Sequence, residues 1–222
     1  ESGSGKSTIA KLILMATNPD SGRIVFEGEQ IKNEPKSLKK IRMQCQMVYQ
    51  DPYDSINPRM KVGDIVSEPL QIHNIGNVLE RKKMIMDALK EVKLEPTEEI
   101  VEKYPHMLSG GQRQRVVIAR ALVMRPKIII ADEPVSMLDV SIRAEILELM
   151  KEIQKKNNIS FIYITHDLAT ARYFGQNIVI LYLGKIMEAG SINQVLMRPR
   201  HPYTQALIDA ISEPDPDNLY KK

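Results

Sequence analysis

The sequence predicts an α/β fold with a mainly parallel sheet, and two observations lead to this prediction. Short apolar runs, typical of strands buried on both faces, alternate with longer segments of helical periodicity. The clearest runs are IIIA at residues 128–131 and FIYI at residues 161–164, with apolar residues at helical spacing over 142–153 between them. Strand, helix and strand in this order are typical of parallel neighbours joined by a crossover helix.

The N-terminal part is expected to contain a helix, a hairpin and one more strand. From Ser7 to about Ala16 the apolar residues recur at helical spacing, until NPDSG at residues 18–22 breaks the pattern. Residues 23–31 favour an antiparallel hairpin, and residues 46–49 a short strand that ends at Gln50. A loop stiffened by two prolines follows Gln50.

The middle of the chain is expected to be helical. Ile85, Leu89 and Val92 fall at i, i+4 and i+7, which predicts an amphipathic helix. More helix is expected around residues 98–103 and 112–124, and a closing hairpin at 178–187. We expect one domain over 1–222, with a helical subdomain at 62–124 inserted into an α/β core of residues 1–61 and 125–200.

The composition is that of an ordinary globular protein, and it argues against several classes of site. The 222 residues are 43% hydrophobic and 27% charged, and the net charge of +3 argues against a dedicated nucleic-acid binder. Cys45 is the only cysteine, so the chain can form neither an internal disulfide nor an all-cysteine metal site. No apolar run approaches the roughly 18 residues of a membrane-spanning helix.

The first eight residues, ESGSGKST, match most of a phosphate-binding loop of pattern G-x-x-x-x-G-K-[ST]. Glycines allow the backbone N–H groups to turn inward around an anion, and the helix beginning near Lys6 adds a positive end. Lys6 can reach the β- and γ-phosphates, and the Ser7 hydroxyl suits Mg²⁺. The alternative is a glycine-rich turn capped by serine. The predicted nucleotide-binding residues are Ser2, Gly3, Ser4, Gly5, Lys6, Ser7 and Thr8.

The first glycine of this pattern would lie one residue before Glu1. We therefore expect the functional protein to begin several tens of residues earlier, with the strand that leads into the loop and the residue that stacks on adenine both upstream. Without that strand its neighbours would have unpaired backbone groups, so the 222-residue chain alone is expected to fold poorly and to bind ATP weakly.

Two acidic residues follow the apolar run 128–131. Asp132 is expected to hold Mg²⁺ through water, and Glu133 to polarise the attacking water as a general base. The alternative is a strand end that meets solvent.

The pentapeptide LSGGQ, Leu108 to Gln112, predicts a second phosphate-binding surface. Ser109 can cap the following helix, while Gly110 and Gly111 leave their amides open at its positive end. One nucleotide needs one such surface, whereas in a dimer LSGGQ of each subunit could close over the phosphate loop of the other. The alternative is a capped helix after a flexible linker. The residues expected to contact nucleotide in this way are Ser109, Gly110, Gly111 and Gln112.

Over essentially its whole length the chain resembles the ATPase subunit of an ABC transporter. GxGKST, Gln50, LSGGQ, Asp132-Glu133, the SMLD of residues 136–139 and His166 come in the order of that family. The resemblance implies a P-loop NTPase fold, ATP and Mg²⁺ as ligands, and a second ATPase subunit in a homo- or heterodimer. It implies that Gln50 reaches towards Mg²⁺ and the attacking water, that Asp139 contacts the opposite subunit, and that His166 contacts the γ-phosphate. Met137 departs from the family, which has a small residue there.

A narrower resemblance lies outside the catalytic motifs. VYQDPYDSINPRM at 48–60, YPHMLSGGQRQRV at 104–116 and the tail at 201–222 are similar to ATPase subunits of dipeptide and oligopeptide importers, the first stretch being closer to the F-type subunit. This implies a peripheral protein at the cytoplasmic face of the cell membrane. It implies transmembrane permease subunits as partners, an indirect link to an extracytoplasmic substrate-binding protein, and no nucleic acid.

Two other functions are alternatives to peptide import. An ABC-type ATPase acting on DNA would need long coiled-coil arms between Gln50 and LSGGQ, and the sequence between them is too short, while ribosome-acting relatives usually carry two cassettes. A small-molecule P-loop kinase would have no role for LSGGQ.

Overall fold

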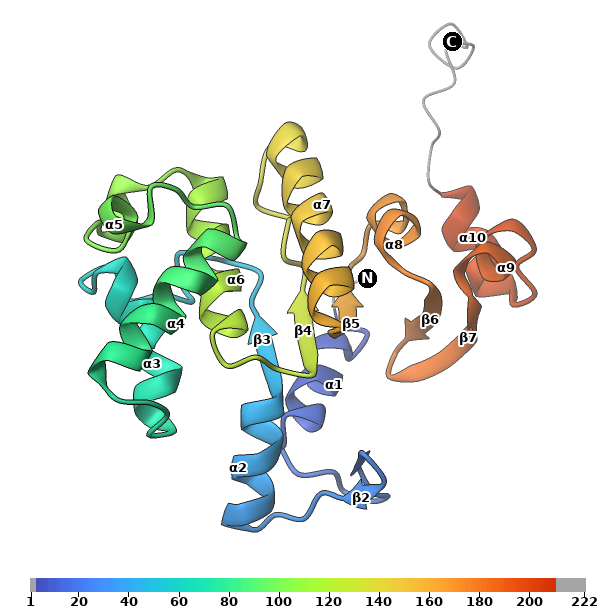
Figure 1. Cartoon of the computed structure of the whole chain (residues 1–222). Coiled ribbons are helices and arrows are strands. Elements are labelled where there is room, and N and C mark those ends of the chain that lie inside the picture. The colour runs from blue at the N-terminus through green and yellow to red at the C-terminus, as the bar shows by residue number, and fades with distance from the viewer. Residues whose placement is uncertain (1–2, 211–222) are drawn as a thin grey trace, which may run out of the picture. The chain divides into compact units, whose positions relative to one another are not determined.

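The computed structural model describes residues 3–210, which form two compact units (Figure 1). The larger unit comprises residues 7–164. The smaller unit comprises the residues from Thr165 onward together with the first residues of the chain up to Lys6.

A three-stranded parallel sheet is the centre of the larger unit, as the sequence predicts. It consists of β3 (Cys45–Val48), β4 (Ile128–Asp132) and β5 (Ser160–Ile164), with β4 in the middle. Val48 lies opposite Ala131, and Asp132 opposite Ile164, so the carboxyl ends of the three strands meet at one edge of the sheet. Helices cover both faces of β4, and Ile129, Ile130 and Ala131 are fully buried.

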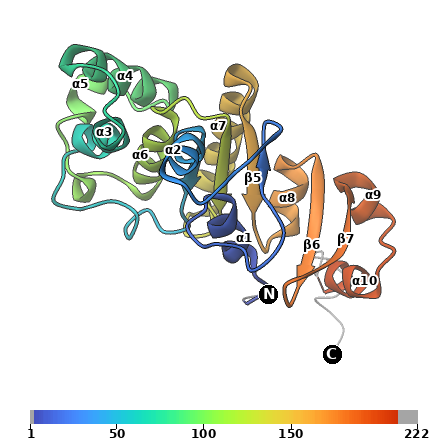
Figure 2. The same ribbon diagram turned by 90° about the horizontal axis from the view of Figure 1, so that it is seen from below.

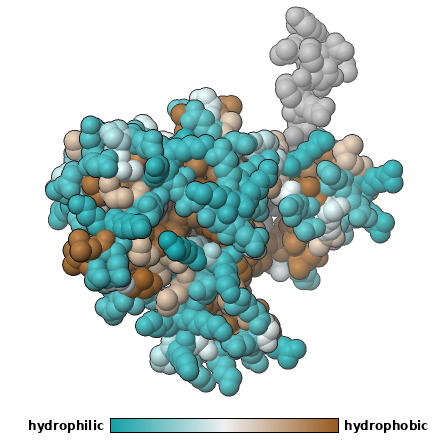
Figure 3. Space-filling view, viewed as in Figure 1, coloured by the Kyte–Doolittle hydropathy of each residue, from teal (hydrophilic) through white to brown (hydrophobic). Residues whose placement is uncertain are grey.

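Every regular element between β3 and β4, a stretch that is described throughout, is helical. The elements are α3 (Val62–Ile72), α4 (Val78–Glu91), α5 (Thr97–Ile100), a 3₁₀ turn (Pro105–Met107) and α6 (Gly110–Leu122). Figure 1 shows them gathered beside β3, and the view in Figure 2 agrees. Both α3 and α4 pack on α6, which carries the most buried side chains of the group. The face seen in Figure 3 is mostly hydrophilic over these helices.

The N-terminal elements pack on the sheet. They are α1 (Lys6–Ile13), the antiparallel strands β1 (Val25–Phe26) and β2 (Glu29–Gln30), and α2 (Pro35–Gln44). Ala10 of α1 contacts Ile130 and Ile164 in one apolar cluster, which fixes the helix against β4 and β5. The hairpin is shorter than predicted, and α1 ends before Ala16. α2 had no prediction, because only Ile41 of its ten residues is buried and most of the others are polar.

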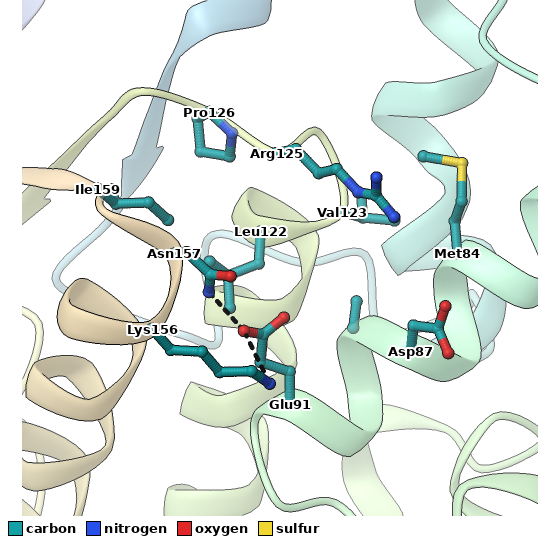
Figure 4. A pocket seen from close by; sticks show the side chains of 11 residues that line it. Met84, Asp87, Glu91, Leu122, Val123, Arg125, Pro126, Lys156, Asn157 and Ile159 are labelled. Atoms are coloured by element: carbon teal, nitrogen blue, oxygen red, sulfur yellow. Dashed lines mark hydrogen bonds and ion pairs between the residues drawn. The ribbon is translucent and has the colours of Figure 1, made fainter.

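The long crossover helix α7 (Val140–Asn157) connects β4 to β5. A hollow of about 340 Å³ lies between the C-terminal ends of α4, α6 and α7 (Figure 4). On its wall Glu91 of α4 accepts a hydrogen bond from Asn157 and pairs with Lys156 at 3.6 Å. These contacts connect α4 to α7. None of the predicted site residues lines the hollow.

The smaller unit contains the second predicted hairpin. Its elements are α8 (Leu168–Phe174), β6 (Asn177–Tyr182), β7 (Lys185–Ser191), α9 (Ile192–Met197) and α10 (Pro202–Asp209). β6 and β7 are antiparallel, and α9 and α10 pack on them with the rings of Tyr182 and Tyr203 4.6 Å apart. The tail predicted at 201–222 is described only as far as residue 210. Within residues 3–210 no helix has both the length and the apolar character needed to cross a bilayer.

Candidate functional site

The N-terminal loop has the backbone that a phosphate-binding turn requires. Gly3 and Gly5 have φ values of +84° and +89°, which only glycine adopts without strain. The loop is anchored at Ser4, which is 3% exposed and whose carbonyl accepts a hydrogen bond from Gly184 N at 3.1 Å. α1 begins at Lys6, so its N-terminal amides follow directly on the turn. Ser2 lies outside the described residues.

Ser7 and Asp132, both predicted to bind magnesium, lie next to each other. The Ser7 hydroxyl donates to Asp132 Oδ2 at 2.8 Å. Ser7 is in the first turn of α1 and Asp132 is the last residue of β4, and the Ala10–Ile130 contact one turn further along fixes the two elements. Thr8 follows on the same helix with an exposed side chain.

A hydroxyl and a carboxylate side by side can both be ligands of Mg²⁺, because this ion prefers oxygen ligands and keeps several of its waters. Among the described residues no group of three or more histidine, cysteine or acidic side chains could hold a metal by itself. The residues therefore fit an ion that is held by one carboxylate, one hydroxyl and a phosphate, as Mg²⁺ commonly is.

Gln50 and Glu133, 83 positions apart in the sequence, are also in contact. Gln50 Nε2 donates to Glu133 Oε2 at 3.1 Å. Gln50 lies two residues beyond β3 and Glu133 one residue beyond β4, and these strands are parallel neighbours that end at the same edge. The arrangement holds a carboxylate and an amide at the carboxyl end of the sheet, where open α/β sheets bind their ligands.

The backbone at Glu133 is in the left-handed region, with φ of +46°. Its N–H donates to the carbonyl of Ile164 at 2.9 Å, and its carbonyl accepts a hydrogen bond from the Ser136 hydroxyl at 3.0 Å. These bonds hold a conformation that a non-glycine residue takes up only at a cost.

The LSGGQ turn caps α6 as predicted and adds a reciprocal bond. Ser109 Oγ accepts from Gln112 N at 3.2 Å, and Gln112 Oε1 accepts from Ser109 N at 3.0 Å. This is a capping box, whose signal in the sequence is serine followed three residues later by glutamine.

The two glycines of the turn differ in their surroundings. A Cβ at Gly111 would lie 2.7 Å from Ile142 Cγ2 of α7, whereas a Cβ at Gly110 would lie 3.7 Å from Leu138 Cδ2. Gly111 is therefore required by the close approach of α6 and α7. Asp139, the residue before α7, makes no capping hydrogen bond with its side chain, which is exposed, as is that of Met137.

This difference predicts opposite results for two matched substitutions. Gly111→Ala is expected to lower the free energy of unfolding by about 1–3 kcal/mol through overpacking. Gly110→Ala is expected to leave it unchanged or to raise it by up to about 1 kcal/mol, since alanine favours a helix. Urea unfolding of both variants provides the measurement, and Ile142→Ala added to Gly111→Ala should recover part of the loss. Equal stability of the two single variants would contradict the packing argument.

His166 comes two residues after β5 and belongs to the smaller unit, where its side chain is exposed. The structure thus brings together two pairs of predicted residues, Ser7 with Asp132 and Gln50 with Glu133, and it places Ser109 and Gln112 in one cap. The packing of Gly111 on α7 had no prediction.

Comparison with known proteins decides the family. A family model described as ABC transporter matches residues 1–136, and one described as the C-terminal region of oligopeptide/dipeptide transporters matches residues 187–222. The chain belongs to the ABC transporter family. This ABC ATPase is 47% identical to the oligopeptide transport ATP-binding protein OppF of Streptococcus mutans, over 97% of this chain and 70% of that one.

Two solved structures share the fold of this ABC ATPase. CbiO1 of Clostridium perfringens, described as part of the ABC transporter complex cbiONQ, has a TM-score of 0.81 and 30% identity, over 98% of this chain and 82% of that one. The ATP-binding cassette MJ0796, in a dimeric post-hydrolysis state bound to ADP and Pi, has a TM-score of 0.74 and 33% identity, over 86% of this chain and 82% of that one. The predicted P-loop NTPase fold and the predicted ATPase family are confirmed.

Proposed function

We propose that this ABC ATPase binds and hydrolyses ATP to power the import of dipeptides or oligopeptides. The observation that carries the proposal is the Gln50–Glu133 hydrogen bond, because it fixes a carboxylate at the end of β4 next to Asp132, where a water would be activated. The peptide substrate is supported by the family match over residues 187–222 and by the similarity to OppF.

Each residue has a separate part in this reaction. The amides from Gly3 to Lys6 bind the phosphates of ATP, and Ser7 and Asp132 hold Mg²⁺ with Gln50 near it. The ion, when bound, neutralises charge on the β- and γ-phosphate oxygens. Glu133 accepts the proton of the attacking water, Gln50 orients that water and this carboxylate, and His166 contacts the γ-phosphate.

Dimer closure completes the site in this proposal. The amides of Gly110 and Gly111 and the side chains of Ser109 and Gln112 meet the nucleotide held by the other subunit, and Asp139 contacts that subunit. ATP bound between two subunits stabilises the closed dimer by mass action, and hydrolysis lets it open. The helices of 62–124 move as a subdomain on a core of residues 1–61 and 125–200.

A groove of about 350 Å³ in the larger unit is our candidate for the permease contact. Tyr49 at the start of the loop, Arg42 at the end of α2, and Ile72 and His73 at the end of α3 are among its lining residues. Burial lowers the pKa of His73, and the nearby charges of Lys39 and Arg42 lower it further, which favours the neutral imidazole. The lining residues come from before and after Gln50 in the sequence, so a permease that binds in the groove at the cytoplasmic face would contact both segments. The permease in turn receives peptide from an extracytoplasmic binding protein.

Co-expression with the permease subunits of a peptide importer from the same organism tests the proposal. A tag on this chain is expected to co-purify those subunits, and ATP hydrolysis by the complex is expected to rise with peptide-loaded binding protein. Ile72→Asp in the groove should abolish co-purification, while Val78→Asp, at an exposed apolar residue outside the groove, should not. Recovery of nucleic acid or ribosomes without membrane subunits would contradict the proposal.

A further inference from the structure

Two arginines of α6 hold the loop that follows Gln50. Residues 51–55, here called the loop, are the first part of the stretch between Gln50 and α3 (Val62–Ile72), and they contact α6 through Tyr53 and Ser55. α6 also carries the LSGGQ turn, residues 108–112, at its N-terminus. The helix α6 therefore contacts both the loop after Gln50 and the LSGGQ turn.

Arg113 contacts the two motifs with a single side chain. Its Cζ lies 4.0 Å from the centroid of the Tyr53 ring, a cation–π arrangement. Its Nε and Nη2 both donate to the carbonyl of Leu108, at 3.0 and 2.8 Å. The guanidinium is thus stacked on the loop while its edge is bonded to the first residue of LSGGQ.

Arg120 fixes the loop two turns further along α6. Its Nη1 donates to the carbonyl of Ser55 at 2.6 Å, and it lies 3.9 Å from Glu68 of α3. Burial lowers the pKa of Arg120, but an arginine stays charged, so the group needs both partners. Arg120 anchors the far end of the loop to the helical block.

The loop between these anchors is internally bonded. Asp51 Oδ1 accepts from Tyr53 N at 2.7 Å, and the Asp51 carbonyl accepts from Ser55 N at 3.1 Å. Gln50 precedes this turn directly and bonds to Glu133. A displacement of Tyr53 therefore moves a bonded turn whose other end carries the amide beside the catalytic carboxylate.

We propose that Arg113 is a positioning residue that couples Gln50 to the LSGGQ turn of the same subunit. This inference rests on the proposed function, in which Gln50 acts at the nucleotide bound by its own subunit and LSGGQ contacts the nucleotide bound by the partner subunit. Arg113 would then link the two nucleotide sites of a dimer through each subunit. A movement of the loop, by a permease or by ATP, changes the position of Leu108 and hence of the amides that follow it.

Arg115 provides a matched control on the same helix. Its guanidinium donates to the carbonyl of Val92 at 3.0 Å and pairs with Glu145 of α7 at 3.3 Å, so it contacts neither motif. Lysine lacks the planar fork of arginine and cannot both stack on a ring and donate twice to one carbonyl. Arg113→Lys and Arg115→Lys thus make the same chemical change with and without the proposed coupling.

A fluorescence experiment on the full-length protein tests the coupling apart from hydrolysis. The given sequence has no tryptophan, so the indole of Tyr53→Trp reports on the loop, and tryptophan keeps the cation–π contact. We expect AMP-PNP with Mg²⁺ to change the indole emission in Tyr53→Trp and in Tyr53→Trp/Arg115→Lys. The change should be lost in Tyr53→Trp/Arg113→Lys although nucleotide is still bound.

Turnover in the permease complex provides the second measurement. Arg113→Lys and Tyr53→Leu are each expected to reduce the stimulation of hydrolysis by loaded binding protein, on the order of 5–150-fold, the usual range for coupled sites. Because Tyr53 is 61% exposed, its replacement should not unfold the chain. The two changes together should cost no more than one alone.

The outcomes separate the two proposals. Equal emission changes and equal stimulation in Arg113→Lys and Arg115→Lys, with nucleotide bound, would overturn the coupling and leave the ATPase function intact. Absence of nucleotide binding in the unsubstituted protein would overturn the proposed function, and the coupling with it.

Discussion

Glu133→Gln is expected to slow ATP hydrolysis by about 10²–10⁴-fold, the usual contribution of a general base. Glutamine keeps an oxygen that can accept the hydrogen bond from Gln50 Nε2, so the local geometry is retained while the basic group is lost. ATP should still bind, and the closed dimer should accumulate because it can no longer hydrolyse its nucleotide. Phosphate release and retained nucleotide, measured on the same preparation, check both statements.

Glu99→Gln is a suitable control for this change, since it removes an exposed carboxylate from α5 by the same substitution. Its turnover should equal that of the unsubstituted protein. Turnover of Glu133→Gln close to this level would show that another group accepts the proton.

Ser109→Arg is expected to abolish ATP-driven dimerisation while leaving ATP binding by the monomer intact. The Ser109 side chain is exposed at the start of α6, where the γ-phosphate held by the partner would approach in the proposed dimer. A long side chain at this position obstructs that approach. Light scattering with and without ATP measures dimerisation, and filter binding measures nucleotide affinity.

The substitution also removes the capping hydrogen bond that Ser109 accepts from Gln112 N. Ser109→Ala controls for this, because it removes the cap, at a cost of about 1 kcal/mol, without adding bulk. Ser109→Asn keeps a capping side chain. Both controls lose the Ser109 hydroxyl but add little bulk, so they are expected to dimerise at a higher ATP concentration than the unsubstituted protein. A normal ATP-dependent dimer of Ser109→Arg would rule out the role of LSGGQ across the interface.

The parts of the fold with a strong local pattern could be predicted from the sequence. The run at 128–131 is the central strand, because an apolar segment of this length without polar alternation needs cover on both faces. α2 could not be predicted, because it lies at the surface, buries one residue and is rich in lysine. The predicted end of α1, at about Ala16, lies three residues too late, because apolar residues continue beyond Ile13 in positions that are no longer helical.

In the candidate site, too, only the features with a local sequence pattern could be predicted. Glycine spacing and the capping pattern are local, so the phosphate loop and the LSGGQ cap were predictable. The Gln50–Glu133 bond depends on which strands are neighbours, and the stacking of Arg113 on Tyr53 depends on how α6 packs beside the loop. The close approach of Gly111 to Ile142 likewise belongs to tertiary packing, and no residue pattern shows it.

The left-handed backbone at Glu133 affects which substitutions at this position would stabilise the protein. At φ of +46° a side chain costs roughly 1–2 kcal/mol that glycine would not, so stability and hydrolysis make opposite demands on this position. A gene copy released from the need to turn over ATP would gain stability by replacing the glutamate with glycine, and Glu133→Gly should accordingly melt above Glu133→Gln. In the proposed mechanism, the residue that hydrolysis requires at this position is one that folding alone would replace by glycine.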